Sequence, residues 1–308
     1  MFVTTYSDYM KKGLLLLLLC TFIIQSNART RTLPKTVLDQ ATVTVYYRFT
    51  QQATVGTTIV ELTDTTILRI GSIYSVYFNR SSILRDSVFS ATFNSIDRDQ
   101  IRSIQMFPIG SDDAQRAIDN MMGGLDFISQ PNPETTRIFK NRQTHLITSI
   151  DGDFDSPLAR TSTREMFLVE EIIPPMEWEI FPDTMTILSY LCFKATTTFR
   201  GRKYIAWFTL DIPINEGPWK IYGLPGLILR LEDADGLFVH KAVGLTSHAS
   251  KPIVINAGTY TIASNAQLQR WIENGRNHAV RRTGFSRGTL MVVGIRNELN
   301  FHRREIGN

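Results

Sequence analysis

The chain has 308 residues, a formal net charge of +4 and only two cysteines. Its charged residues are interspersed and form no basic stripe, so we expect no nucleic-acid partner. Two cysteines, one of them inside an N-terminal apolar run, exclude a disulfide-rich scaffold.

The first 28 residues are typical of a cleavable secretory signal peptide. Lys11 and Lys12 precede the apolar run Gly13–Ile24, and small residues before a cut after Ala28 complete the pattern. The run is shorter than the roughly 20 residues that a membrane-spanning helix needs. Cys20 follows leucines instead of the small residue of a lipoprotein signal, which favours ordinary cleavage. Met1 and Met10 are both open as the start.

We therefore expect an exported protein located in the periplasm, on the outer membrane or outside the cell, and not integral to a membrane after cleavage. Residues 29–308 show no linker, charge block or fixed-period repeat, which predicts a single β-rich domain. Loss of Asp8, Lys11 and Lys12 lowers the net charge from +4 to +3. The remaining Cys192 lies between Leu191 and Phe193, a setting that favours a buried, inert thiol.

Strand signals dominate residues 29–308. Thr42–Thr50 alternates, with Val43, Val45, Tyr47 and Phe49 on one face. β-branched and aromatic residues predict further strands at Ile67–Ile70, Ser72–Phe78, Arg137–Ile150, Met166–Ile173, Met185–Arg200, Lys203–Leu210, Leu227–Asp233, Gly236–Leu245 and Thr289–Arg296. Arg200-Gly201-Arg202 and Ala234-Asp235-Gly236 are expected to be hairpin turns.

Two helices are expected beside these strands. Ser111-Asp112-Asp113 would cap Ala114–Met122, and Asn265–Arg282 carries apolar residues at helical spacing. The predicted fold class is α+β: a mainly antiparallel, curved β-sheet or half-barrel with a few helices.

Patterns that would carry chemistry are weak, and we expect no cofactor and no preformed metal site. The Gly284–Gly288 segment matches G-x-S-x-G around Ser286, but a helix is predicted before it and a strand after it, the reverse of a hydrolase elbow. Asp151–Asp155 resembles the start of a calcium loop without its later glycine and glutamate. One alternative function is a secreted hydrolase whose site is assembled from distant residues, for example these acids with His145.

The most distinctive segment is Tyr190–Asp235. Ile212-Pro213 and Gly217-Pro218 interrupt the strand pattern because proline lacks an N–H group and fixes φ. Pro225 and Gly226 suit positions i+1 and i+2 of a type II turn, after which the apolar Leu227–Leu231 returns to the core.

This segment resembles the GLPGLI family. The family's name stands complete in Gly223, Leu224, Pro225, Gly226, Leu227 and Ile228, and Ala206–Thr209 and Gly217–Lys220 resemble its central block. The resemblance extends upstream to Leu68–Gly71 with Ser75 and Phe78. It implies an exported protein of Bacteroidetes and implies no particular activity.

Aromatic and basic residues around this corner define a predicted binding set: Lys194, Arg200, Arg202, Trp219, Lys220 and Tyr222. Such a set suits an anionic glycan, a lipid headgroup or an acidic peptide. The alternative interpretation is structural, with glycine and proline forming a sharp corner and the aromatic residues filling the core. The favoured function is an envelope or secreted accessory protein that binds a ligand or partner on one sheet face. A periplasmic lipid-binding half-barrel is a further alternative.

Overall fold

The structure, a computed structural model, describes residues 29–55, 57–80, 136–151, 166–247, 250–268, 270, 280–286, 289–295 and 299–301. The predicted signal peptide, the predicted helix Ala114–Met122 and most of the Asp151–Asp155 loop lie outside these residues. Within them, no helix is long and apolar enough to cross a membrane.

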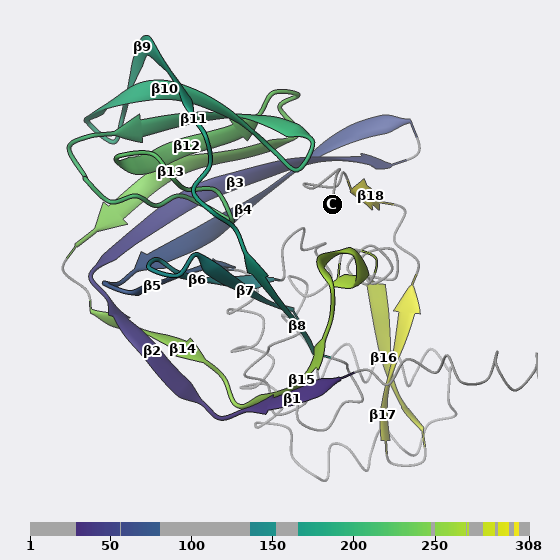
Figure 1. The fold of residues 1–308 in the computed structure, drawn as a ribbon. Coiled ribbons are helices and arrows are strands. Elements are labelled where there is room, and N and C mark those ends of the chain that lie inside the picture. The colour runs from purple at the N-terminus through teal and green to yellow at the C-terminus, as the bar shows by residue number, and fades with distance from the viewer. Residues whose placement is uncertain are drawn as a thin grey trace, which may run out of the picture.

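Strands make up nearly all of the regular structure (Figure 1). Those of the first half are β1 (Thr30–Leu33), β2 (Thr36–Ala41), β3 (Val43–Val55), β4 (Thr58–Ile70), β5 (Tyr74–Asn79), β6 (Arg137–Asn141), β7 (Leu146–Asp151) and β8 (Phe167–Ile172). The later strands are β9 (Glu179–Ile187), β10 (Tyr190–Phe199), β11 (Arg202–Thr209), β12 (Leu227–Asp233), β13 (Phe238–Thr246), β14 (Lys251–Ile255), β15 (Gly258–Ile262), β16 (Val280–Ser286), β17 (Thr289–Ile295) and β18 (Leu299–Phe301).

Fourteen of these strands form one large sheet, in the order β1-β15-β8-β7-β6-β5-β4-β3-β13-β12-β11-β10-β9, with β18 paired to β3. The sheet is mixed because β15 and β8 run parallel, and it does not close into a barrel. Its predicted curvature stays a prediction. β2 pairs with β14 and β16 pairs with β17 in two small sheets.

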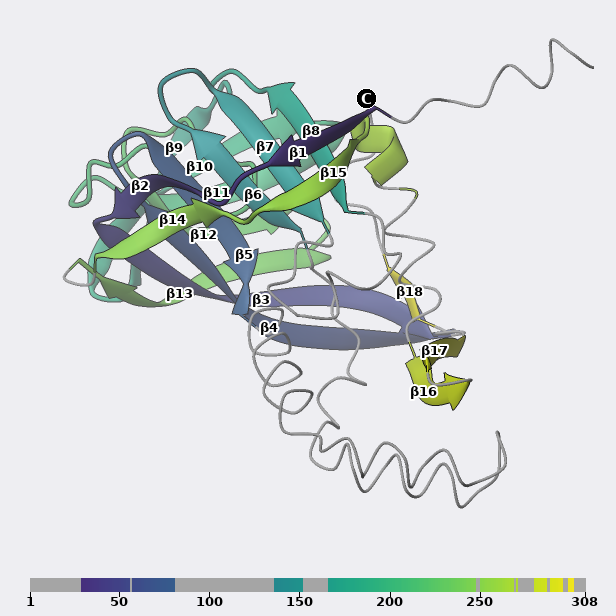
Figure 2. The same ribbon diagram turned by 90° about the horizontal axis from the view of Figure 1, so that it is seen from below.

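The predicted strand faces are confirmed in β3, where Val45, Tyr47 and Phe49 have no solvent exposure. The two faces of the sheet are buried in different places. Leu68 of β4 packs in a core with the β10–β13 strands, whereas its neighbour Ile67 packs in a second core beneath β2 and β14. Figure 2 shows β2 and β14 side by side across the strands of the large sheet. Both faces of the sheet are therefore covered at the C-terminal end of β4, around Ile67 and Leu68.

A carboxylate of β2 fixes the turn between β4 and β5. Asp39 accepts hydrogen bonds from the N–H groups of Ile73 at 2.7 Å and Tyr74 at 2.9 Å. A Cβ on Gly71 would lie 2.5 Å from an Asp39 oxygen, so this position excludes a side chain. Burial acts to raise the pKa of Asp39, but N–H groups, including that of Gln40, outweigh it and hold the pKa below its ordinary value.

Two segments that were each predicted as a single strand are in fact hairpins of two strands. Arg137–Ile150 divides into β6 and β7, and Met185–Arg200 divides into β9 and β10. The second turn places Leu188 at φ 50° and Ser189 at φ 68°, a conformation that a two-residue hairpin requires and that glycine or asparagine usually supplies. The predicted turn at Arg200 and Gly201 is confirmed, with both residues at positive φ.

The second predicted helix is much shorter in the described part of the chain. Residues 265–268 form a helical turn, and Ser264 caps it in a capping box with Gln267. Residues 280–282, which the prediction placed at the helix end, belong instead to strand β16. Ser286 ends that strand opposite Thr289, so it lies at a hairpin and not in a loop after a helix.

Candidate functional site

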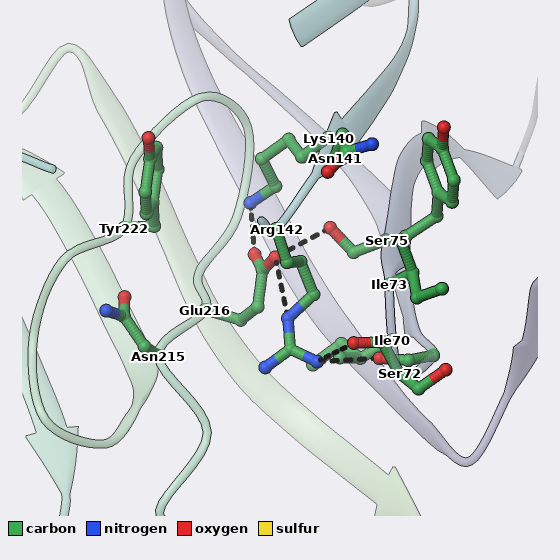
Figure 3. Close-up of polar contacts among 12 residues, drawn as sticks. Ile70, Ser72, Ile73, Ser75, Lys140, Asn141, Arg142, Asn215, Glu216 and Tyr222 are labelled. Carbon is green, nitrogen blue, oxygen red and sulfur yellow. Dashed lines mark hydrogen bonds and ion pairs between the residues drawn. The ribbon is translucent and has the colours of Figure 1, made fainter. Parts of the chain in front are cut away.

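The long connection between β11 and β12 carries a buried carboxylate. Glu216 of this connection is 2% exposed and accepts a hydrogen bond from Ser75 Oγ at 2.8 Å. It also forms an ion pair with Lys140 Nζ, and Arg142 Nε lies 3.6 Å from its Oε1 (Figure 3). Because Ser75 belongs to β5 and Lys140 to β6, Glu216 attaches the connection to two strands of the sheet.

The cations around Glu216 have further partners. Lys140 donates to the carbonyl of Gly217 at 2.8 Å, and Arg142 donates to the carbonyl of Gly71 at 2.7 Å. Burial lowers the pKa of Lys140, and the charge of Glu216 acts against this shift. Arg142 Nε is buried without a hydrogen-bond partner of its own, but the charges and the other hydrogen bonds of the group join three chain segments, an arrangement that anchors them.

Tyr222 forms a second anchor beside the first. Its hydroxyl donates to the carbonyl of Ile173 and lies 3.2 Å from His145 Nδ1, with the two rings stacked 5.9 Å apart. Burial, followed by the charge of Glu216, raises the pKa of Tyr222 to about 12. The hydroxyl is therefore protonated at neutral pH and acts as a hydrogen-bond donor.

Three residues of the predicted binding set meet in the interior near β8. Arg200 and Lys220 both form ion pairs with Glu171, Lys220 at 2.7 Å. Trp219 is 5% exposed and packs edge-on against Phe199. The structure thus places Trp219 and Lys220 inside the protein, and leaves Arg200 only partly accessible.

The other members of the predicted set lie elsewhere. Arg202 is 7% exposed and bonds to Asp233 at 2.9 Å. Burial raises the pKa of Asp233, while a backbone N–H and Arg202 act to lower it. Lys194 is cross-strand from Trp207 and so points to the sheet face opposite Ala195 and the core. The six residues therefore do not form one open surface.

The segment Gly223–Ile228 is a packing element. A Cβ on Gly226 would lie 1.9 Å from the carbonyl oxygen of Thr209, so the motif's second glycine permits a close backbone approach. Gly226 is not at positive φ, and the predicted type II turn at Pro225-Gly226 is therefore wrong; the positive φ of 113° belongs to Gly223. Leu224, Leu227 and Ile228 are buried, and Ile228 N–H donates to the carbonyl of Glu216.

An accessible group of basic side chains lies on the outward face of the large sheet. The strand registers place five residues directly opposite one another, one from each of β10, β11, β12, β13 and β3. These residues, which we call the outer row, are Lys194, Trp207, Arg230, Lys241 and Arg48. Lys241 and Arg48 are exposed, and the other three are half-buried.

The neighbouring positions place the row on the sheet face opposite a fully buried row, although Trp207 itself packs against the core cluster that contains Cys192. One residue further along each strand stands a second row that is entirely buried: Ala195, Ala206, Leu231, His240 and Phe49. Arg48 shares its face with Tyr46, which packs beneath β2 and β14. The outer row therefore lies where the outward face continues beyond the cover of β2 and β14.

Two cations of the outer row have acidic neighbours. Lys194 lies 4.0 Å from Asp183 and 5.7 Å from the Phe181 ring centre, and Arg230 pairs with Glu232 at 2.6 Å. Within the described residues, Lys241 and Arg48 have no ion-pair partner. Since Lys241 stands directly between Arg230 and Arg48, like charges face each other across three strands.

This repulsion predicts that Lys241→Glu stabilises the fold. Cross-strand like charges are unfavourable and opposite charges favourable, so the change should add about 0.5–1 kcal/mol to the free energy of unfolding. Lys241→Gln, which removes only the repulsion, should give a smaller gain. Urea denaturation measures both, and a Lys241→Glu variant less stable than the wild type would show that the row carries no repulsion.

Of the residues of the hydrolase alternative, the structure describes His145 and Asp151, and these two do not meet. His145 immediately precedes β7 and Asp151 ends it, which separates them by roughly 20 Å along the strand. In the described ranges, no three His, Cys, Asp or Glu residues gather as a metal site would require. Cys192 is buried, as predicted, and burial raises the pKa of its thiol to about 11.

Sequence reasoning missed both Glu216 and the outer row. Glu216 is a single acid between Asn215 and Gly217, with no pattern around it. Of the row, Lys194 was predicted as a binding residue and Trp207 belongs to the family resemblance. Arg230, Lys241 and Arg48 each occupy a position that strand alternation directs outward, between residues that point inward. Noting the cations at such positions in each strand is the signal that could have found them.

Comparisons with known proteins give a family match over a short part of the chain. Residues 199–230, which hold β11 and the connection bearing Glu216, match a family described as "Protein of unknown function (Porph_ging)". The GLPGLI name is not part of that description and stays a prediction. No curated protein matches the chain.

Solved structures give a weak likeness. Two crystal forms of PNGF-II align with 15% and 16% identity, each with a TM-score of 0.40 and 79% of this chain covered. The alignment covers 35% of the PNGF-II chain, so the present chain spans about a third of its length. What the comparisons establish is that residues 199–230 are similar to a family whose function is unknown.

Proposed function

We propose that this chain is an exported protein, of the envelope or secreted, that binds a ligand without transforming it, on the outward face of its large sheet. Export rests on the signal-peptide pattern of residues 1–28. The observation that carries the binding site is the outer row, four cations and a tryptophan aligned across five strands, in which Lys241 and Arg48 are exposed and the other three residues keep part of their surface accessible.

Two further observations support this site over the Arg200–Tyr222 corner. The corner's charges are paired inside the protein: Lys220 with Glu171 attaches the β11–β12 connection to β8, and Arg202 with Asp233 joins the start of β11 to the end of β12. Lys241 and Arg48, by contrast, are exposed and repel each other, which disfavours the fold unless an anion is bound. Lys194 is common to the predicted binding set and the outer row.

The test is a binding screen of the exported protein against three anionic classes: an acidic polysaccharide, vesicles containing phosphatidylglycerol and an acidic peptide. The variant Arg48→Glu/Lys241→Glu reverses the row. Its matched control, Lys35→Glu/Lys251→Glu, changes net charge equally at two exposed lysines near the β2–β14 pair.

We expect at least one class to bind the wild type and the control alike and to lose about tenfold or more in affinity with the row variant. Equal binding by the row variant and the control to every class would refute the proposed site. Thermal unfolding of all three proteins verifies that the row variant is folded.

A further inference from the structure

The outer row is one residue wide. The next row on the same face lies two residues away from the outer row along each strand, and it consists of Thr196, Ile205, Glu232, Val239 and Thr50. Glu232 is the only charged residue of this next row. On the other side, Cys192 of β10 and Thr209 of β11 are buried and uncharged. The positive charge therefore forms a line at right angles to the strands.

The dimensions of this line follow from sheet geometry. Neighbouring strands lie about 4.8 Å apart, so Lys194 and Arg48, four strand spacings apart, are separated by roughly 19 Å. Arg230, Lys241 and Arg48 occupy consecutive strands, whereas Trp207 stands between Lys194 and Arg230. A ligand that matches this row is extended and carries anionic groups in single file.

We infer, on the basis of the proposed function, that the outer row binds a linear acidic polysaccharide whose chain crosses the strands, with its carboxylates on Lys194, Arg230, Lys241 and Arg48. Trp207 lies within the row, half-buried against the core, and the part of an indole that stays exposed beside cations suits the face of a sugar ring. Glycosidic chains of uronic acids place one carboxylate on each ring and so supply charges in single file.

The same features disfavour the other anionic polymers and surfaces. A single-stranded nucleic acid requires several aromatic residues for successive bases, and the row has one. A lipid surface is matched by a two-dimensional basic patch with apolar side chains for insertion. Here the adjacent row contains Glu232, whose charge opposes phosphate groups on a broad surface.

The experiment titrates the exported protein with galacturonate oligomers of defined length, from the dimer through the tetramer to the octamer, at low salt. Affinity should rise with length until the chain spans the row and then level off. Methyl-esterified oligomers, which keep the sugar but lack the charge, should bind at least tenfold more weakly. Because the contacts are exposed, added salt should weaken binding.

Variants separate the two kinds of contact. Trp207→Ala should cost about tenfold in affinity and leave the salt dependence unchanged, whereas Lys241→Glu should cost a similar factor and reduce the salt dependence. The Lys35→Glu/Lys251→Glu control should bind like the wild type. Circular dichroism and unfolding curves of each variant confirm that it is folded.

The outcomes distinguish this inference from the proposed function. Row-dependent binding of vesicles, acidic peptide or single-stranded DNA that is tighter than binding of the octamer would leave the binding face in place and overturn the polysaccharide. A dimer that binds as tightly as the octamer, or an esterified oligomer that binds equally well, would also overturn it. Absence of row-dependent binding to every probe would overturn both.

Discussion

Glu216→Leu is expected to lower the free energy of unfolding by about 3–5 kcal/mol, because it leaves the buried Lys140 ammonium without its counter-charge. Lys140 is 3% exposed and would keep only the carbonyl of Gly217 as a named acceptor. Ser75 Oγ would lose its acceptor as well. Urea denaturation followed by tryptophan fluorescence measures the loss.

A double variant tests the cause. Glu216→Leu/Lys140→Met removes both charges and fills a similar volume, and replacement of a whole buried ion pair is often close to neutral. We therefore expect the double variant to recover most of the stability that Glu216→Leu loses. If the single variant loses less than about 1 kcal/mol, or the double variant is as unstable as the single one, Glu216 is not the anchor described above.

Gly226→Ala is expected to destabilise the protein by about 3 kcal/mol or more, or to prevent folding. The added Cβ would lie 1.9 Å from the oxygen and 2.8 Å from the carbon of the Thr209 carbonyl. Both are backbone atoms at the end of β11, so no side chain can rotate to make room. Thermal unfolding and the yield of soluble protein report the effect.

Gly236→Ala is the matched control for this prediction. Gly236 has φ +70°, and nothing lies within 4 Å of a Cβ built there. The substitution carries only the conformational cost of a left-handed residue, about 1–2 kcal/mol. A Gly226→Ala variant that is as stable as Gly236→Ala would show that the close approach to Thr209 is not required.

The sequence predicted turns well where glycine marked them and poorly where it did not. Arg200-Gly201 and Asp235-Gly236 carry the expected signal for a hairpin, and both turns are present. Leu188-Ser189 makes a turn with two non-glycine residues at positive φ. The intrinsic turn propensities of leucine and serine do not predict such a turn, because a positive φ is unfavourable for them and the surrounding structure must compensate for its cost.

Gly226 shows a second limit of sequence reasoning. A glycine is required either where φ is positive or where another backbone comes close, and the letters alone do not distinguish the two. From the sequence, Gly226 was expected to have a positive φ. In the structure the positive φ belongs to Gly223, and Gly226 is required because the backbone of Thr209 lies close to it.

The candidate site depended on information that no single segment contains. Trp207 and Arg230 belong to strands separated by the long connection, and Arg48 lies far upstream on β3. Only the pairing of β13 with β3 and the registers on either side place these residues in one line. Strand alternation could predict that each side chain points outward, but not that they share a row.

The most direct test of the binding face uses the indole N–H signals of the four tryptophans in a ¹⁵N-labelled sample titrated with the galacturonate octamer. Trp207 stands in the outer row, while Trp219 is buried at the Arg200 corner and Trp178 bonds to the carbonyl of Tyr222. We predict that the Trp207 signal shifts as the ligand is added and that the signals of Trp178 and Trp219 stay in place. A shift of Trp219 with Trp207 unchanged would contradict the account and return the site to the corner.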